Sequence, residues 1–428
     1  MSDRKLSDEQ VEALWHKADA AGMSRRKFLL ILGASGAAAV LAACTPRVTT
    51  TTPSPSPTTT TTAPPTTTTP PPARLVDEPT PAQFFDPIGG ANYEMHMDLM
   101  ASRTYAMPNS FFFTRSHTSS TVFIDPATWK LSIQGDGVAS PFDLTYDELL
   151  KMPATTVTRY VECAGNGRSF YKTLLNNPAQ GGQWHLGAYG IAEWTGVKLS
   201  DLLSRAGIKS TAVDVMPIGL DSTKVERPVS VAKAMESDTL VAYMMNGDLL
   251  PIDHGFPARV LTPGWVGVNN IKWVSTIRVS TTPIQTEKNT TTYVLIGPDY
   301  QPNPPALGPP VTNQVLKSAC CLPWPNAALK AGSQTVVGYA WSPFGKIAKV
   351  DVSLDGGTTF QSAALSGPNI ERAGARWQIT FDATPAMSSI TPRATDDQGN
   401  VQPPVSQQKW NQQGYIFGAM VPHPVTVS

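Results

Sequence analysis

Alternating apolar and polar residues predict short β-strands in the first half of the chain. Residues 129–135 and 155–161 alternate with a period of two, and residues 239–245 form a β-prone apolar run that leads into an Asn-Gly turn. Two other segments carry helix signals. Residues 145–150 open with a threonine N-cap and an acidic first turn, and residues 199–203 are followed by a closing glycine. We therefore expect short strands mixed with short helices.

The second half shows strand patterns instead. Residues 335–341 and 347–354 are β-prone, and an Asp-Gly-Gly turn follows the second of them. Short strands at regular spacing with turn signals indicate a β-sandwich. The predicted class is α+β, with a mixed α/β domain over residues 81–285 and a linker with an all-β domain over residues 286–428. We expect the proline-rich residues 283–310 to link the two domains or to wrap between them.

The N-terminus carries signals for export. Residues 24–30, SRRKFLL, form a twin-arginine pattern, and a short apolar stretch that ends in small residues follows. Residues 41–44, LAAC, also match a lipobox in which Cys44 is lipidated. Residues 1–44 are therefore predicted to be a twin-arginine lipoprotein signal, which implies a periplasmic or cell-surface protein anchored to the membrane through Cys44. The alternatives are an uncleaved anchor helix and a cleaved signal in which this cysteine has no role.

Residues 45–80 are predicted to be a disordered linker. Up to residue 72 they are almost entirely Thr, Pro and Ser, a composition that buries no core and stays extended. The functional interpretation is a spacer that holds a catalytic body away from a membrane or wall. The alternative is an inert tether of arbitrary length.

Composition excludes several classes of function. The chain has 33 Lys plus Arg and 33 Asp plus Glu, so no excess of charge favours nucleic acid as a partner. Apart from Cys44, the cysteines are Cys163, Cys320 and Cys321, too few for a disulfide framework. We expect Cys320 and Cys321 to point to opposite faces of a strand as buried thiols, with a vicinal disulfide as the alternative. Six histidines without a His-Glu-x-x-His motif disfavour a conventional zinc site.

The most informative segment is residues 159–168, RYVECAGNGR, in which one cysteine follows a predicted strand. Ala164, Gly165 and Gly167 carry little or no side chain, so we expect room for a bulky group beside the backbone near the sulfur. Arg168 adds a permanent positive charge. A thiolate near a fixed cation is a soft metal ligand or a nucleophile. The alternative is a cysteine that serves only as a small buried hydrophobe.

Three separated motifs resemble, in their order, those of the sulfite oxidase-like molybdopterin oxidoreductases. They are Cys-Ala-Gly-Asn-x-Arg from Cys163, His-Gly-Phe-Pro-x-Arg-Val over residues 254–260, and Asn-Ile-Lys-Trp over residues 270–273. Residues 350–357 and 392–396 look like that family's immunoglobulin-like dimerisation domain. The resemblance implies a sulfite oxidase-type mixed α/β molybdopterin-binding domain followed by an all-β immunoglobulin-like sandwich, assembled as a homodimer.

In that family a single pterin dithiolene and one cysteine thiolate hold molybdenum. The resemblance therefore implies a molybdenum–molybdopterin cofactor with Cys163 as the metal ligand, and a soft thiolate suits such a metal. The cofactor-binding residues implied by matched positions are Phe113, Thr114, Arg115, Ser116, His117, Asp221, His254, Arg259, Asn270, Ile271 and Lys272. Arginine, lysine and amide donors are the groups that a phosphate requires.

The resemblance is weaker around the substrate. The residues that match the family's sulfite pocket, and are expected to be catalytic, are Arg115, Arg168 and Trp184. Val225 occupies the place of the family's pocket tyrosine. The family's C-terminal His-Arg-Val is His-Pro-Val here, so Pro424 predicts the loss of one anion-binding arginine, which the nearby Arg227 is a candidate to replace.

The expected function is the oxidation of sulfite, or of a related small sulfur compound, by oxygen-atom transfer. No Cys-x-x-Cys-His or His-Pro-Gly-Gly haem motif occurs, so electrons are expected to pass to an external acceptor such as a c-type cytochrome or a membrane redox protein. Direct use of oxygen stays open. The alternatives are a reductase of S-oxides or N-oxides on the same cofactor, a cysteine hydrolase with His117, His185 or His254 as base, and a non-catalytic surface protein.

Overall fold

A computed structural model describes residues 82–118 and 122–428, which belong to one compact unit that spans Arg74–Ser428. The predicted export signal with Cys44 and the predicted linker lie outside the described residues. Among the residues that the model describes, no helix is long and apolar enough to cross a membrane.

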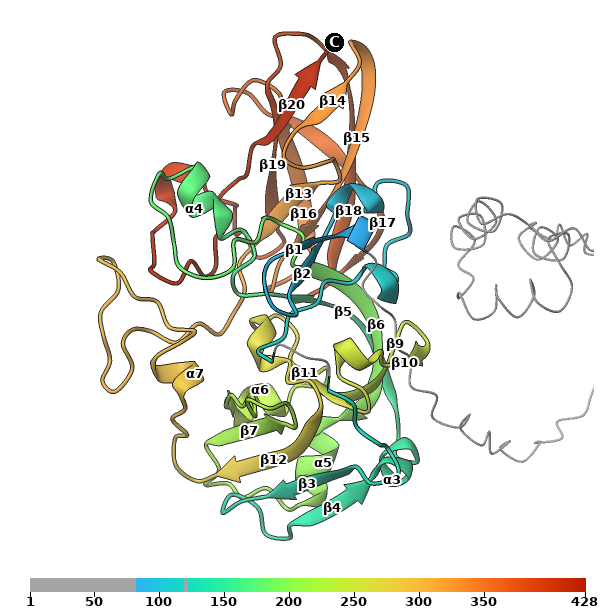
Figure 1. Cartoon of the computed structure of the whole chain (residues 1–428), viewed down its shortest axis with the longest axis vertical. Helices are drawn as coiled ribbons and strands as arrows, with labels where there is room; N and C mark the ends of the chain where they lie inside the picture. Colours follow the sequence, from blue (N-terminus) through green and yellow to red (C-terminus); the bar gives the residue numbers. More distant parts are fainter. Residues whose placement is uncertain (1–81, 119–121) are drawn as a thin grey trace, which may run out of the picture. The chain divides into compact units, whose positions relative to one another are not determined.

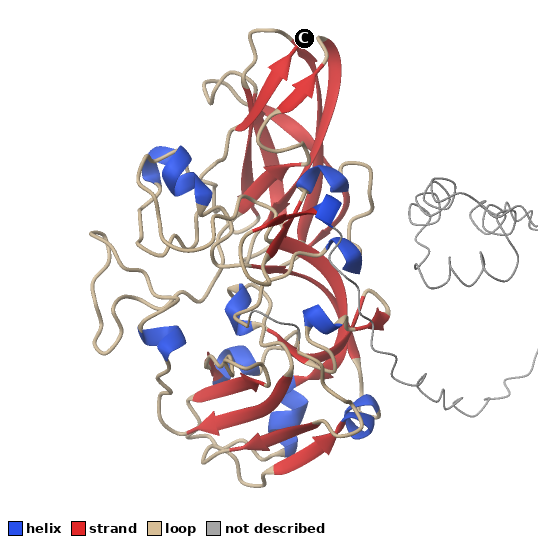
Figure 2. Cartoon of the chain, viewed as in Figure 1, coloured by secondary structure: helices blue, strands red, loops and turns tan. Residues whose placement is uncertain are grey.

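The first domain is built mainly from strands that short helices connect (Figures 1 and 2). Its strands are β1 (Phe85–Pro87), β2 (Tyr93–Met95), β3 (Lys130–Gln134), β4 (Phe142–Thr145), β5 (Thr155–Glu162), β6 (Tyr189–Lys198), β7 (Asp214–Gly219), β8 (Val229–Ser230), β9 (Leu240–Met245), β10 (Asp248–Leu249), β11 (Arg259–Leu261) and β12 (Val274–Ser280). Its α-helices are α3 (Tyr146–Leu150), α4 (Ser169–Thr173), α5 (Leu199–Arg205) and α6 (Val231–Ala234). Its 3₁₀ turns are η1 (Ala82–Phe84), η2 (Met97–Met100), η3 (Asn109–Phe111), η4 (Ile252–His254) and η5 (Gly267–Asn269).

The linker and the second domain complete the chain. They comprise α7 (Glu287–Thr290), β13 (Lys317–Cys320), β14 (Ala327–Leu329), β15 (Gly332–Trp341), β16 (Ile347–Ser353), β17 (Gln361–Ile370), β18 (Gly374–Ala383), β19 (Ser389–Asp396), η6 (Val405–Gln407) and β20 (His423–Val427).

Local sequence signals explain several of these boundaries. At the start of α3, Thr145 and Glu148 form a reciprocal capping box, as the N-cap pattern predicts. β9 ends at a tight turn in which Asn246 and Gly247 both have positive φ, 53° and 79°, and the chain returns as β10. These predicted elements are confirmed, each within a few residues of the expected bounds.

Two five-stranded sheets form most of the first domain, and β1 and β2 pair in a separate two-stranded sheet. One five-stranded sheet has the order β10-β9-β6-β5, with β11 also paired to β9, and all its pairs are antiparallel. The other has the order β4-β3-β12-β7-β8, in which β3 and β12 run parallel. β5 and β11 therefore belong to one sheet, although about a hundred residues separate them in the sequence. Both lead into the loops that build the cavity described below.

The second domain is all-β, and its strands follow the path β13-β15-β18-β17-β16-β19-β20-β14. β17 pairs with β16 through its first residues and with β18 through its last, so one strand belongs to both halves of this path. The molecule is mostly β with few short helices, and its C-terminal domain is all-β, as expected. The α+β class and the immunoglobulin-like arrangement stay predictions.

Cys320 and Cys321 are adjacent in the sequence but pack in two different hydrophobic cores. Both are buried free thiols, as expected. Cys321 packs in the large core of the first domain, together with Tyr339 and Trp341, whereas Cys320 packs in the core of the second domain. Burial raises the pKa of Cys321 to about 12, so this thiol stays protonated. The large core therefore extends across the boundary between the domains.

Candidate active site

Cys163 lies directly after β5, at the start of a loop that backbone hydrogen bonds hold. Its N–H donates to Ala188 O at 2.9 Å, its carbonyl accepts from Asn166 N at 3.0 Å, and its sulfur accepts from Gly165 N at 3.4 Å. Val161 and Cys163, two residues apart, line the same cavity, which confirms the period-two alternation at the end of this strand. Cys163 is 5% exposed, so its sulfur is buried in the wall of this cavity.

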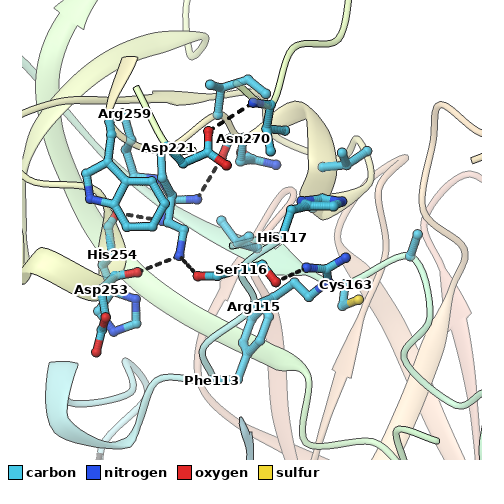
Figure 3. Close-up of a pocket in the computed structure, with 18 of the residues that line it drawn as sticks. Phe113, Arg115, Ser116, His117, Cys163, Asp221, Asp253, His254, Arg259 and Asn270 are labelled. Atoms are coloured by element: carbon cyan, nitrogen blue, oxygen red, sulfur yellow. Dashed lines mark hydrogen bonds between the residues drawn. The ribbon is translucent and has the colours of Figure 1, made fainter. Parts of the chain in front are cut away.

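A cavity lies beside this sulfur, and Figure 3 shows side chains that line it. Most of the residues that the sequence motifs select line this cavity: Phe113, Arg115, Ser116, His117, Cys163, Asp221, His254, Arg259, Asn270, Ile271 and Lys272. They come from four separate stretches of the first domain, which the two sheets bring together.

Thr114, Arg168 and Trp184 were expected here but do not line the cavity. Thr114 is buried and pairs through its backbone with Tyr93. Trp184 is buried behind the wall and packs edge-on against the ring of Phe113, with ring centres 6.5 Å apart. The structure therefore places both side chains behind residues that do line the cavity.

Arg168 lies behind the cysteine loop. Its Nε donates to Gln413 O at 2.7 Å and its Nη1 to Gly182 O at 2.7 Å. The guanidinium occupies the space beside Gly165, where a Cβ would overlap it. The absence of a side chain at Gly165 thus makes room for this arginine and not, as expected, for a bulky ligand.

The cavity contains buried cations that lack full compensation. Arg259 donates to His254 O at 3.1 Å and to Asn270 O at 3.2 Å, but its buried Nε has no partner among the described residues. Burial lowers the pKa of Arg259 to about 9. Lys272 donates to Ser116 Oγ at 2.6 Å and to Asp253 O at 2.7 Å. Burial, with Arg259 nearby, lowers the pKa of Lys272 to about 7. An anionic ligand would compensate the buried charges of both Arg259 and Lys272.

Two histidines of the cavity are neutral. Burial and the neighbouring Lys272 lower the pKa of His254 to about 3, and burial and Arg115 lower that of His117 to about 2. Both imidazoles therefore act through hydrogen bonds and not through charge at neutral pH. The side chain of Asn270 is used locally, because its Oδ1 accepts from Thr262 N at 2.8 Å.

The sequence motifs do not point to Tyr293, which comes from the linker between the domains and lines the cavity. Its hydroxyl lies 3.1 Å from His117 Nε2 and 3.4 Å from Arg115 Nη2. Its ring stacks on that of Tyr415, with centres 4.9 Å apart and planes 9° apart. Arg227 is buried and lies over the Tyr293 ring at 5.3 Å, behind it rather than in the cavity. The sequence feature that could have pointed to Tyr293 is the proline-rich segment 283–310, which was expected to link the domains or to wrap between them.

The C-terminal comparison with the family needs a correction. His423 and Pro424 belong to β20, where His423 Nε2 bonds Pro323 O at 3.0 Å and lines a different cavity. The C-terminal residues that approach the cysteine loop include Gln413, whose carbonyl accepts from Arg168, and Ile416, whose N–H donates to Ala164 O at 2.8 Å. The ring of Tyr415 lies beside the Arg168 guanidinium. Pro424 therefore does not mark a lost pocket arginine. Val225, in contrast, lines the cavity as the sequence comparison expects.

The donor set fits a molybdenum–molybdopterin cofactor. Cys163 offers a soft sulfur on one side of the cavity, and Arg259, whose buried Nε has no partner among the described residues, offers positive charge on the other (Figure 3). Lys272 adds a second buried basic side chain to the lining. Within residues 82–118 and 122–428, no group of three or more His, Cys, Asp or Glu could hold a metal ion alone. A cysteine sulfur that faces a cavity lined by buried cations fits a metal–pterin oxidoreductase.

Comparisons with known proteins identify the family. Residues 117–288 match the oxidoreductase molybdopterin-binding domain, and residues 310–421 match the Mo-co oxidoreductase dimerisation domain. Chicken sulfite oxidase is 34% identical over 346 residues, which are 77% of this chain and 74% of the relative. The chain therefore belongs to the sulfite oxidase family of molybdopterin oxidoreductases. Its cofactor is molybdenum–molybdopterin, and the dimerisation domain supports a homodimer.

Two further relatives show the extent of the likeness. Rat mitochondrial sulfite oxidase is 34% identical over 337 residues, 75% of this chain, but the chain spans only 61% of that protein's length. The crystal structure of the sulfane dehydrogenase SoxCD from Paracoccus pantotrophus matches with a TM-score of 0.70 and 28% identity, covering 79% of this chain and 84% of that one. The chain is thus similar to proteins that are named for two different sulfur compounds, sulfite and sulfane.

Proposed function

We propose that the protein oxidises sulfite, or a related small sulfur oxyanion, and passes the electrons to an external acceptor. The observation that carries this proposal is the position of Arg115 in the same buried cavity as Cys163. Burial lowers the pKa of Arg115, but Tyr293 and Cys163 more than offset this and raise it, so the guanidinium stays charged. A fixed positive charge beside the metal ligand suits a small anion.

The chain's own residues divide the work of holding cofactor and substrate. Cys163 would ligate the metal, and Arg259 and Lys272 would hold the anionic part of the pterin group. When bound, the molybdenum cofactor supplies two-electron oxygen-atom transfer. Arg115 would bind the substrate oxyanion, and the neutral His117 would add one hydrogen bond. The buried or partly buried positions of these side chains strengthen the polar contacts that they would make.

The electron acceptor and the location complete the proposal. An external partner, such as a c-type cytochrome or a membrane redox protein, would take the electrons one at a time. Export by the twin-arginine route, with lipid anchoring at Cys44, is proposed from residues 1–44 alone. Export and lipid anchoring are both tested by fractionating cells that produce the full chain or its Cys44→Ser variant. Loss of the lipid in the variant would release the protein from the membrane.

A cysteine hydrolase is a poorer explanation of the same cavity. The Cys163 sulfur accepts from a backbone amide, and the candidate bases bond elsewhere: His117 to Tyr293, and His185 Nδ1 to Glu94 at 2.7 Å. His254 is neutral but is packed edge-on against Phe112. A nucleophile–base pair requires direct hydrogen bonding between its members.

A substrate panel on the molybdenum-loaded protein tests the proposal. Sulfite, thiosulfate, S-oxides and N-oxides would be assayed with dye acceptors and donors. We expect oxidation of sulfite or thiosulfate and loss of more than about 100-fold of this rate in Cys163→Ser, with molybdenum lost on elemental analysis. Cys320→Ser, at a buried thiol outside the cavity, is the matched control and should keep metal and rate. Reduction of S-oxides without oxidation of any sulfur anion would replace the proposed reaction.

A further inference from the structure

A buried ion pair joins the second domain to the residue that precedes Cys163. Lys317 Nζ lies 2.7 Å from Glu162 Oε1, and the two side chains are 2% and 0% exposed. Glu162 is the last residue of β5, and Lys317 is the first residue of β13. The pair therefore connects the strand that carries the cysteine to the first strand of the second domain.

The groups around this pair satisfy it almost completely. Glu162 Oε1 also accepts from Asn166 Nδ2 at 2.9 Å, and Oε2 accepts from Trp341 Nε1 at 2.9 Å. The carbonyl of Glu162 accepts from Gln314 Nε2 at 2.7 Å. Trp341 is itself stacked on Tyr189, with ring centres 3.8 Å apart. Three of the four side chains that donate to Glu162, those of Lys317, Trp341 and Gln314, thus come from the second domain or the segment that leads into it.

Lys317 makes a second bond that encloses the cysteine. Its Nζ also donates to Asn166 O at 2.8 Å. Asn166 in turn donates its N–H to Cys163 O and accepts from Ala188 N through its side chain. One ammonium group therefore holds the residue before Cys163 and the loop three residues after it, so the sulfur lies between two fixed points.

We propose that Lys317 and Glu162 position the Cys163 thiolate and set the electrostatic potential at the metal that it binds. The second domain then serves the metal centre as well as dimerisation. Neither residue touches the cavity, so both are positioning residues. The proposal rests on Cys163 as the metal ligand in the proposed function and is independent of which sulfur compound is the substrate.

The charges predict the sign of each effect. Removing Lys317 leaves a negative carboxylate one residue from the thiolate, which favours the oxidised metal and lowers its reduction potential. Neutralising Glu162 leaves a buried ammonium, which favours the reduced metal and raises the potential. Removing both charges restores neutrality. Each single change should alter the equilibrium constant of one-electron reduction roughly tenfold, as for one unit charge across several ångströms of protein.

The test is an EPR-monitored redox titration of molybdenum-loaded full-length protein. Lys317→Met, Glu162→Gln and the double variant Glu162→Gln/Lys317→Met would be compared with wild type. We expect shifts of opposite sign in the two single variants, cancellation in the double variant, and a changed Mo(V) spectrum wherever the thiolate orientation changes. If Lys317→Met does not fold, Glu162→Gln against the double variant still measures the effect of the lysine charge.

Arg372→Met is the matched control. Arg372 also pairs across the domains, 2.5 Å from Glu236 and 3.3 Å from Asp238, but none of the three lines the cavity. Its removal should leave the potential and the Mo(V) spectrum unchanged. Shifts of the same sign in both single variants, no shift in either, or an equal shift in Arg372→Met would overturn the proposal. The redox titration reads the metal centre and needs no substrate. If the protein does not oxidise sulfite, the titration therefore still tests the roles of Lys317 and Glu162.

Discussion

The two sides of the cavity differ in how far the protein itself balances their charges and satisfies their hydrogen bonds. On the side of Cys163, the ion pair of Glu162 and Lys317 has its charges balanced and its hydrogen bonds made. On the side of Arg259 and Lys272, positive charge is buried, one guanidinium nitrogen has no partner within the part of the chain that the structure describes, and burial lowers both pKa values. We call these the thiolate side and the cation side of the cavity.

This difference separates the residues that hold the metal ligand in place from the residues that bind an anionic ligand. The thiolate side is preorganised by groups that remain within the protein, so the metal ligand is held in place before any ligand binds. The cation side carries a desolvation cost that its own hydrogen bonds and the carboxylates of Asp221 and Asp253 offset in part, and an anionic ligand would offset more of it. Variants on the thiolate side should therefore damage the protein itself, whereas variants on the cation side should damage binding. Four predictions test this contrast, in order of decreasing effect.

Lys317→Met should cause the largest loss, because it leaves the carboxylate of Glu162 buried without its counter-charge. We expect the free energy of unfolding to fall by about 3–5 kcal/mol, measured by chemical denaturation of the cofactor-free protein. Arg372→Met, which removes a partly exposed pair, should cost about 1 kcal/mol or less. Equal losses in the two variants would remove the distinction between the thiolate side and an ordinary ion pair.

Arg259→Met should weaken anion binding more than it weakens the fold. Losing a charge-assisted contact costs about 1.5–3 kcal/mol, so the affinity of the cofactor-free protein for sulfate should fall about 10- to 100-fold in titration calorimetry. The unfolding free energy should fall by less than in Lys317→Met, because a poorly compensated cation is removed. A variant that binds sulfate normally but unfolds easily would reverse the assignment of the cation side.

The pH dependence of sulfate binding should follow Lys272. In the free site its pKa is lowered to about 7, and a bound anion raises it, so binding takes up a proton above that pH. Affinity should be constant below pH 7 and then weaken by up to about tenfold per pH unit as the lysine loses its charge. Sulfate keeps its own charge throughout this range. Lys272→Arg should flatten the profile, and an unchanged slope in that variant would assign the titration to another group.

Tyr293→Phe should have the smallest effect, because it removes one hydroxyl that holds Arg115 and His117. One such hydrogen bond contributes about 0.5–1.5 kcal/mol, so we expect KM for sulfite to rise about two- to tenfold with little change in kcat. Tyr146→Phe is the control, since that buried hydroxyl has no partner among the described residues and lies outside the cavity. A fall in kcat alone would give Tyr293 a role in the chemical step.

Much of the fold could be predicted because its signals are local. The capping box at Thr145, the turn at Asn246 and the alternation through Val161 each depend on neighbouring residues. The two adjacent cysteines on opposite faces follow from the pleat of a strand. The motifs around Cys163 and Lys272 also predicted most of the cavity, since each motif carries several of its residues together.

Other features depend on contacts between distant segments. Tyr293 enters the cavity because the linker packs against Tyr415, and no short motif records that contact. Arg168 was expected in the pocket, but Gly165 leaves space behind the loop that its guanidinium occupies. Pro424 was compared with a pocket position only because a short C-terminal pattern looked similar, and β20 places it elsewhere.

The sequence by itself determined the family, the cofactor and the thiolate, because these depend on residue types at close spacing. Only the tertiary structure decided which charges meet. Glu162 and Lys317 lie 155 residues apart, and nothing in either neighbourhood predicts their 2.7 Å contact. Because the pair is buried, removing one member leaves the other charge without water or a counter-charge, which strongly destabilises the fold. The same burial leaves Arg259 and Lys272 dependent on an anionic ligand.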